Sequence, residues 1–279
     1  MHIDMKKRRR MIDKVLFALT WIFAASTLTV LIFIILYIAV SGIPHLRLSL
    51  FEMQHTTQNQ SMLPAMVSTL MVVVLTLSFA VPLGIFTSIY LVEYTRRGNK
   101  FVSIIRSATE MLAGIPSIVY GLFGMLFFVG TMGLGFSLIA GALTLTVMIL
   151  PLVIRTTEEA LKSVPDGYRE GAFALGSGKL RALFKIVLPS AMPGILAGVI
   201  LATGRIVGET AALIFTAGSF AQMPTGITSS GRTLAVHMWA LSSEGHFVNE
   251  AHATAVVLLI IVLFINTISA FIAKRMAKG

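Results

Sequence analysis

The chain consists of long apolar runs separated by short polar segments. A helix needs about 20 apolar residues to cross a bilayer, and six of the runs reach that length. They cover residues 15–40, 63–91, 108–129, 134–154, 191–217 and 251–273. Only the sequence GTMGLG separates the third run from the fourth, so these two helices are expected to form an antiparallel hairpin. The pattern predicts an all-α polytopic membrane protein with six transmembrane helices.

Composition strengthens this prediction. Of the 279 residues, 56% are apolar and only 12% are charged, whereas soluble domains carry about 25% charged residues. The first apolar run follows a basic segment, as in a signal peptide, but it is far longer than the usual core of about 7–15 residues. We therefore expect a retained first span. The absence of cysteine excludes disulfides and thiolate metal sites.

The net charge of +10 is distributed unevenly between the polar segments. All but three of the 22 lysines and arginines lie in the N-terminal tail, in segments 92–107 and 155–190, or at the C-terminus. The exceptions are Arg47, Arg205 and Arg232. Basic residues concentrate in the cytoplasmic loops of membrane proteins, so both termini are expected in the cytoplasm. The positive charge then reports topology in the lipid bilayer, and no nucleic-acid partner is expected.

Three histidines, His237, His246 and His252, lie in or near the long outer segment 218–250. Their spacing fits no pair of metal ligands one helical turn apart. A solvated loop is therefore expected here, rather than a metal site.

The sequence LGSGKLR, around Lys179, superficially resembles a phosphate-binding loop. Such a loop requires GxxxxGK followed by Ser or Thr, because its backbone amides wrap the phosphates and its hydroxyl binds Mg²⁺. Here Phe173 stands at the position of the first glycine, and Leu180 follows the lysine. No nucleotide or other cofactor is therefore expected in this chain.

The same region has the pattern of two short amphipathic helices that meet at Gly176, since glycine commonly ends a helix. Pro189 ends the second helix. In a cytoplasmic loop, such a pair can dock a soluble partner or lie on the lipid headgroups. The residues by themselves leave both interpretations open.

A resemblance to a known motif favours docking. The residues that carry it are Glu170, Gly171, Ala172, Gly176, Ile186, Leu188 and Pro189. They resemble the EAA loop of ABC importer permeases, with matching spacing throughout and glycine in place of the first alanine. The resemblance implies the type I ABC importer permease fold for residues 62–273. It also implies that segment 155–190, called the coupling loop below, docks onto a separate ABC ATPase dimer that uses ATP and Mg²⁺. Residues 1–61 would then carry the basic N-terminus, the first helix and an outer loop, and residues 274–279 a basic tail.

Two charges lie inside the fifth apolar run. Arg205 and Glu209 are four residues apart, so a continuous helix would place them on one face. A charge at the centre of a bilayer costs about 2.5–3.5 kcal/mol and needs a partner or a water-filled path. The pair either stabilises the bundle internally, or Arg205 contacts a transported anion while Glu209 orients it. Arginine suits the second role because its planar donors match phosphate-like oxyanions.

The sequences GRIVGETAALIFTAG and LAGIPSIVYGLFG resemble the corresponding spans of phosphate-importer permeases of the PstA type. This resemblance implies transport of inorganic phosphate across the bacterial inner membrane, with Arg205 and Glu209 as a pathway pair. It also implies a second permease subunit of the PstC type and an external phosphate-binding protein. In the third run, Ser117 and Tyr120 are candidates to line the pathway, and Arg106 with Glu110 is expected to form an interfacial ion pair.

Other functions are weaker alternatives. A permease for another oxyanion, such as sulfate, molybdate or tungstate, would keep the same coupling loop. An ion-driven secondary transporter would show two related halves, and no internal repeat is visible. A membrane-embedded enzyme would need a catalytic constellation within a span, and none is found in the sequence.

Overall fold

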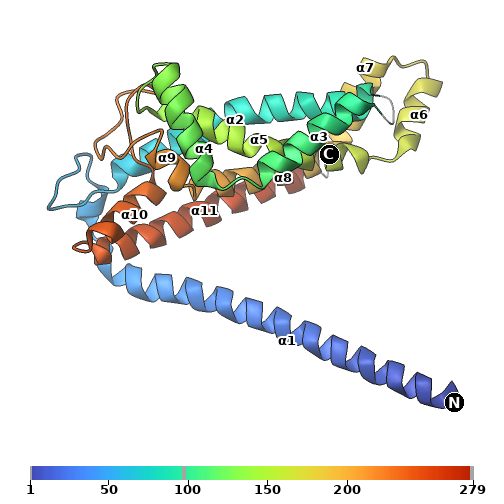
Figure 1. Ribbon diagram of the computed structural model, residues 1–279, viewed down its shortest axis with the longest axis horizontal. Helices are drawn as coiled ribbons and strands as arrows, with labels where there is room; N and C mark the ends of the chain where they lie inside the picture. Colours follow the sequence, from blue (N-terminus) through green and yellow to red (C-terminus); the bar gives the residue numbers. More distant parts are fainter. Residues whose placement is uncertain (1, 96–98, 277–279) are drawn as a thin grey trace.

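The computed structural model describes residues 2–95 and 99–276, and within these ranges the chain forms helices and no strand. The basic positions Arg96, Arg97 and Lys278 lie outside the described residues. Figure 1 shows an elongated helical bundle from which the first helix, α1, diverges. Helices α6 and α7 lie at one end of the bundle, and α9 and α10 lie towards the other. The predicted all-α class is confirmed.

The centre of the bundle is α5 (Leu138–Lys162), which packs against α2 (Leu63–Ile89) and α8 (Leu188–Val207). The core between them is aliphatic and includes Val72, Ile149 and Ile206. Ser88 on α2 donates a hydrogen bond of 2.8 Å to the carbonyl of Ile154 on α5. Interhelical bonds of this kind help to join helices in lipid, where no hydrophobic effect drives them together. Helix α11 (Val248–Met276) packs on α8 and on α10 (Leu234–Glu244).

Between residues 11 and 36, helix α1 (His2–Gly42) has almost no packing against the rest of the chain. It meets α11 near its own C-terminal end, where the ring of Tyr37 lies edge-on to His252 with 6.0 Å between centroids. Gly42 allows this approach, because a Cβ there would overlap the carbonyl oxygen of His252. Two short 3-10 turns, η1 (Ile43–His45) and η2 (Leu48–Phe51), then lead to α2. Residues 15–36 of α1 are largely apolar and exposed, as expected for a helix that faces lipid or another subunit.

The third apolar run is a bent pair of helices. Helix α3 (Lys100–Ala113) ends just before Gly114, and α4 (Ser117–Gly124) begins after Pro116, at an angle of 102° to α3. A proline disfavours the helical conformation of the residue that precedes it, which explains the break. A wide π-helical turn, η4 (Met125–Thr131), continues α4 towards the turn before α5. The predicted third span, 108–129, is thus a sharply bent unit that begins earlier, at Lys100.

The fifth apolar run is also interrupted. Helix α8 ends at Val207, and only the short α9 (Ala211–Ile214) follows. Helix α9 packs tightly against α4, since a Cβ at Gly121 would lie 2.9 Å from the Cα of Ala212. The prediction of one continuous helix over 191–217 was therefore wrong.

The coupling loop is formed by α6 (Asp166–Ala174), α7 (Lys179–Ala182) and a π-helical turn η5 (Leu183–Val187) that runs directly into α8. Residues 155–162, assigned to this loop from the sequence, form the last turns of α5. Another π-helical turn, η3 (Tyr90–Tyr94), extends α2. Five helices or helix runs within the described residues are long and apolar enough to span a membrane, and the bent α3–α4–η4 unit brings the number to six. The predicted six-span layout is thus confirmed, with corrected bounds.

Candidate functional site

The coupling loop is a helix–turn–helix whose turn depends on Gly176. The N–H of Ser177 donates to the carbonyl of Ala172 at 3.0 Å, and the N–H of Gly176 donates to that of Phe173 at 2.9 Å. These two bonds form a Schellman motif, which satisfies carbonyls that the end of α6 leaves free. Gly176 has φ of +76°, a left-handed conformation that glycine adopts without strain. The geometry explains why the motif requires glycine at this position.

The two halves of the motif have different surroundings. Glu170 and Gly171 are exposed, whereas Ala172 is the buried residue of α6. Ile186 and Leu188 are partly buried, and Pro189 lies in the first turn of α8. The loop also exposes a set of large apolar side chains, namely Tyr168, Phe173, Leu175, Leu180 and Phe184, of which Leu175 is 90% exposed. Exposed apolar groups around an exposed carboxylate have the composition of a protein-docking surface.

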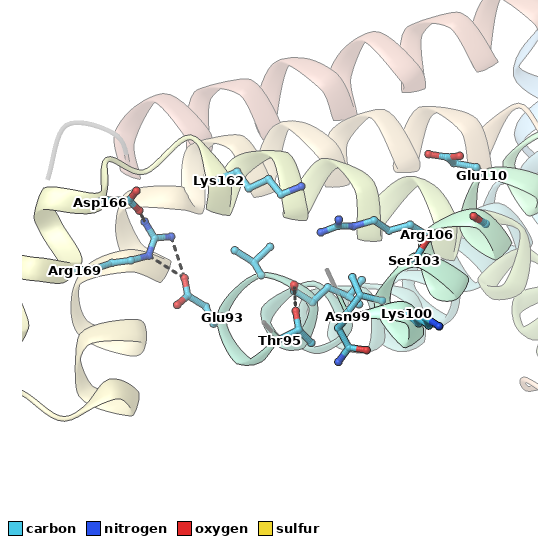
Figure 2. Close-up of a pocket in the computed structure, with 14 residues that line it drawn as sticks. Glu93, Thr95, Asn99, Lys100, Ser103, Arg106, Glu110, Lys162, Asp166 and Arg169 are labelled. Carbon is cyan, nitrogen blue, oxygen red and sulfur yellow. Dashed lines mark hydrogen bonds and ion pairs between the residues drawn. The ribbon is translucent and has the colours of Figure 1, made fainter. Parts of the chain in front are cut away.

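Arg169 ties the base of α6 to two other elements. Its Nε and Nη2 donate to Oε1 of Glu93 at 3.1 and 2.9 Å. Its Nη2 also donates to the carbonyl of Leu161, and its Nη1 to the carbonyl of Val164 and, at 3.4 Å, to Asp166. Figure 2 shows Arg169 and Glu93 pointing towards one another from separate elements. Both side chains are largely buried, at 15% and 11% exposure.

A cavity of about 1000 Å³ opens beside this link, between α3, η3 and the junction of α5 with α6. Arg106 and Lys162 point towards each other across it, and Arg106 points away from Glu110 (Figure 2). Both cations bind Oε1 of the buried Glu158, at 2.5 Å for Arg106 and 2.7 Å for Lys162. The predicted Arg106–Glu110 pair is therefore wrong, because α5 presents a less exposed carboxylate to the same arginine.

Arg205 and Glu209 do not form the expected pair. The break after Val207 removes them from a common helical face, and within the described residues they make no ion pair. Glu209 instead accepts a hydrogen bond of 3.1 Å from the N–H of Ala212 at the start of α9. Arg205 is exposed on α8, and a Cβ built at its neighbour Gly204 would meet nothing within 4 Å. The arginine thus faces away from the core of its own chain.

Tyr120 and Ser117 lie at the bend of the third span. Tyr120 is buried, and its hydroxyl donates 2.7 Å to the carbonyl of Leu112 at the end of α3, so it bridges the two halves of the bend. Ser117 is partly exposed in the first turn of α4. The contact that Tyr120 makes is thus structural.

A second polar cluster lies among the outer segments. Nδ1 of His55 lies 3.0 Å from the carbonyl oxygen of Ser61, and its Nε2 lies 3.2 Å from Nη2 of the largely buried Arg232. Because arginine only donates, Nε2 must be the acceptor, Nδ1–H must donate to the Ser61 carbonyl, and the imidazole is neutral. The ring of His237, fully buried in α10, stands edge-on to that of His55 with 5.7 Å between centroids. The expected solvated loop was therefore wrong for His237.

The environment of this cluster disfavours protonation. Burial, followed by the charge of Arg232, lowers the pKa of His237 to about 3. Burial also lowers the pKa of His55, despite its bond to Ser61, and that of Arg232. Among the residues that the structure describes, no group of three or more His, Asp or Glu side chains has the arrangement of a metal site.

Comparisons with known proteins identify the family. A family model described as "Binding-protein-dependent transport system inner membrane component" matches residues 80–279. The chain belongs to this family. The probable ABC transporter permease protein YqgI of Bacillus subtilis (strain 168) is 33% identical over 97% of this chain and 98% of its own length. The phosphate transport system permease protein PstA 2 of Mycobacterium tuberculosis (strain CDC 1551 / Oshkosh) is 32% identical over 96% and 91%. PstA of Yersinia pestis is 39% identical over 70% and 66%.

Solved structures support the same fold at low identity. The chain matches a bacterial alginate ABC transporter, crystallised with an alginate pentasaccharide-bound periplasmic protein, with a TM-score of 0.67 and 16% identity over 93% of this chain and 96% of the other. It matches the MetNI methionine ABC transporter with a TM-score of 0.59 and 20% identity over 77% and 94%. The chain is thus an ABC importer permease with the type I fold.

Several functional contacts in this permease could not be found by sequence reasoning. Glu93 and Glu158 were not singled out, although each is a carboxylate at the basic end of a span, which is a usable signal. His55 and Arg232 come from separate outer segments, and nothing local in the sequence relates them.

Proposed function

We propose that this permease is a PstA-type subunit and forms half of a pathway for inorganic phosphate. The relatives named as phosphate permeases support this substrate. The observation that carries the proposal is Arg205, an exposed arginine inside a span, without an ion-pair partner among the described residues. A charge at that depth is tolerated where it meets an anion or a water-filled path.

In this proposal Arg205 binds the passing oxyanion through its planar donors. Glu209 has a different role from the one expected: it stabilises the start of α9, and so places the break that leaves Arg205 at the end of α8. Gly204 and Gly208 leave open backbone next to the arginine. In this proposal Ser117, at the bend of the third span, is also a pathway contact, and Tyr120 fixes the bend.

The complete transporter would contain this chain, a second permease of the PstC type, an ABC ATPase dimer and an external phosphate-binding protein. ATP and Mg²⁺ would act in the ATPase, and this chain would carry no cofactor. ATP binding would close the ATPase pair and move the coupling loop, so that the pathway alternates between its two openings. We place the complex in the bacterial inner membrane with both termini in the cytoplasm. In support, α1 begins and α11 ends towards the end of the bundle that carries α6 and α7 (Figure 1).

The test is phosphate uptake by Arg205→Lys and Arg205→Gln in complexes that assemble normally. Lysine keeps the charge but loses the bidentate geometry, so uptake should fall in both variants and further in glutamine. Arg47→Gln, which removes an exposed arginine from an outer turn, is the matched control and should leave uptake unchanged. Unaltered uptake in both Arg205 variants would remove the arginine from the pathway. Uptake of sulfate, molybdate or tungstate instead of phosphate by the wild-type complex would favour the other-oxyanion alternative.

A further inference from the structure

Arg169 is the most completely bonded charged side chain of the coupling loop. A guanidinium carries five N–H donors in a fixed fork, and the structure gives Arg169 five hydrogen bonds. Two bonds reach the carbonyls of Leu161 and Val164, where the end of α5 leaves acceptors without helical partners. These two are local and would be explained by capping alone. The bonds to Glu93 join segments 76 residues apart and need another explanation.

A second link reaches the same short turn from the other side of Gly176. Nζ of Lys179, in the first turn of α7, donates to the backbone carbonyl of Glu93. The same ammonium lies over the ring of Tyr94, 4.7 Å from its centroid, in cation–π geometry. The η3 turn at the end of α2 therefore receives one cation from α6 and one from α7.

Apolar packing cannot replace these polar links for α6. Ala172 is the buried residue of α6, so this helix contributes little hydrophobic surface to the bundle. The other half of the loop is different, because Leu183 and Val187 of η5 are buried in a cluster with Ile89 and Leu161. The η5 turn is thus held by packing, while α6 depends on Arg169 for its position.

We propose that Glu93, acting through Arg169, is the positioning residue that transmits movement of α6 to the second and fourth transmembrane spans. Arg169 holds α6 to the end of α5 through backbone carbonyls, and Glu93 extends that hold to the end of α2. A force applied to α6 then moves two spans together. Without Glu93, α6 remains capped on α5 but is released from α2. This inference rests on the proposed docking of the coupling loop onto the ATPase.

The chain offers a matched pair of carboxylates for the test. Glu93 and Asp166 both contact Arg169, but Glu93 is 11% exposed with bonds of 2.9 and 3.1 Å, and Asp166 is 81% exposed with one bond of 3.4 Å. Each can be neutralised without loss of volume, as Glu93→Gln and Asp166→Asn. A third variant, Arg169→Lys, keeps the charge but cannot reach all the acceptors at once, since lysine has no fork.

The experiment measures inorganic phosphate transported per ATP hydrolysed by the complete complex in proteoliposomes. We expect Glu93→Gln and Arg169→Lys to keep the ATPase associated and active, while phosphate per ATP falls about tenfold, the scale of one lost charge-assisted bond in a largely buried site. Asp166→Asn should match the wild type. A purely structural role would instead lower assembly, ATPase activity and uptake together, and that result would overturn the proposal, as would an unchanged ratio in Glu93→Gln.

A second measurement keeps the result independent of the substrate. Hydrogen exchange of the assembled complex should show faster exchange of α6 amides in Glu93→Gln, with η5 and α8 unchanged. If the wild-type complex does not transport phosphate but α6 still exchanges faster in Glu93→Gln than in the wild type, the proposed substrate is wrong and the proposed link between α6 and α2 stands. Equal exchange of α6 in the wild type and in Glu93→Gln would refute the link, whatever the substrate.

Discussion

The turn of the coupling loop gives a prediction that isolates backbone strain from packing. Gly176 has φ of +76°, and a Cβ built there meets nothing within 4 Å. Alanine at this position therefore encounters no steric overlap, and its only cost is the left-handed conformation, about 1–2 kcal/mol for an L-residue. Gly171 also has open space around its Cβ, but it lies inside α6. Alanine there should stabilise the helix by about 0.5–1 kcal/mol.

The two substitutions thus make the same chemical change, but one should destabilise the closed turn and the other should stabilise it. The difference between them is about 2 kcal/mol, or roughly 30-fold in the equilibrium between the closed and open turn. The assay is hydrogen exchange of the Ser177 amide, which donates to Ala172 in the closed turn. Exchange should be faster than in the wild type for Gly176→Ala and slower for Gly171→Ala.

We also expect Gly171→Ala to keep its association with the ATPase and Gly176→Ala to bind the ATPase more weakly. This result would show that the closed turn is needed for docking. If both variants exchange at the same rate, or if Gly176→Ala protects the amide, strain in the left-handed turn is not what determines the loop, and the reasoning fails.

Three further predictions follow from the packing and from the outer cluster. Gly121→Ala should destabilise the bundle by about 1–3 kcal/mol, because the new Cβ meets backbone of α9, which cannot move aside cheaply. Gly204→Ala, which has open space inside α8, should be at least as stable as the wild type in thermal unfolding. Tyr120→Phe should loosen the bend by about 1 kcal/mol through loss of its hydrogen bond, seen as faster exchange near the end of α3. The lowered pKa of His237, about 3, means that the fold favours the neutral ring, so its contribution is complete above about pH 6.5 and is lost as the pH falls towards 3. The segment around α10 should therefore lose roughly 2 kcal/mol of protection by pH 5, as measured by exchange, and His237→Leu should remove this loss, leaving only the pH dependence that His55 contributes.

Each of these predictions has a specific contradicting result. Equal unfolding temperatures for Gly121→Ala and Gly204→Ala would contradict the close contact of α4 with α9. An unchanged bend in Tyr120→Phe would show that its hydrogen bond is dispensable. Protection of α10 that does not vary between pH 7.5 and pH 5 would show that His237 accepts a proton without opening the fold.

Hydropathy located the spans well because each span in lipid must form its backbone hydrogen bonds within its own helix. The hydropathy of one continuous stretch therefore suffices to predict it. The coupling loop was equally accessible, because its spacing and Gly176 are read along one short stretch. The interruptions were harder to predict. The bend at Pro116 has a visible cause, but the end of α8 at Val207 depends on how α9 packs against Gly121 and α5.

The pairing of charges was the weakest part of the sequence reasoning. A spacing of four suggested Arg106 with Glu110 and Arg205 with Glu209, yet the structure joins Arg106 to Glu158 and leaves Arg205 outside any ion pair in the described part of the chain. For each arginine, a carboxylate one turn away on the same helix competes as ion-pair partner with any carboxylate that tertiary packing brings close. The choice between them depends on tertiary contacts that no local pattern records.

The most direct test of the proposed function is uptake by the reconstituted transporter. The complex of this permease with its second permease subunit, the ATPase and the binding protein would be placed in proteoliposomes and supplied with labelled phosphate and ATP. The account predicts phosphate accumulation that requires ATP, fails in Arg205→Gln and persists in Arg47→Gln. Accumulation that is equal in both variants, or that is absent for phosphate while another oxyanion is taken up, would contradict it.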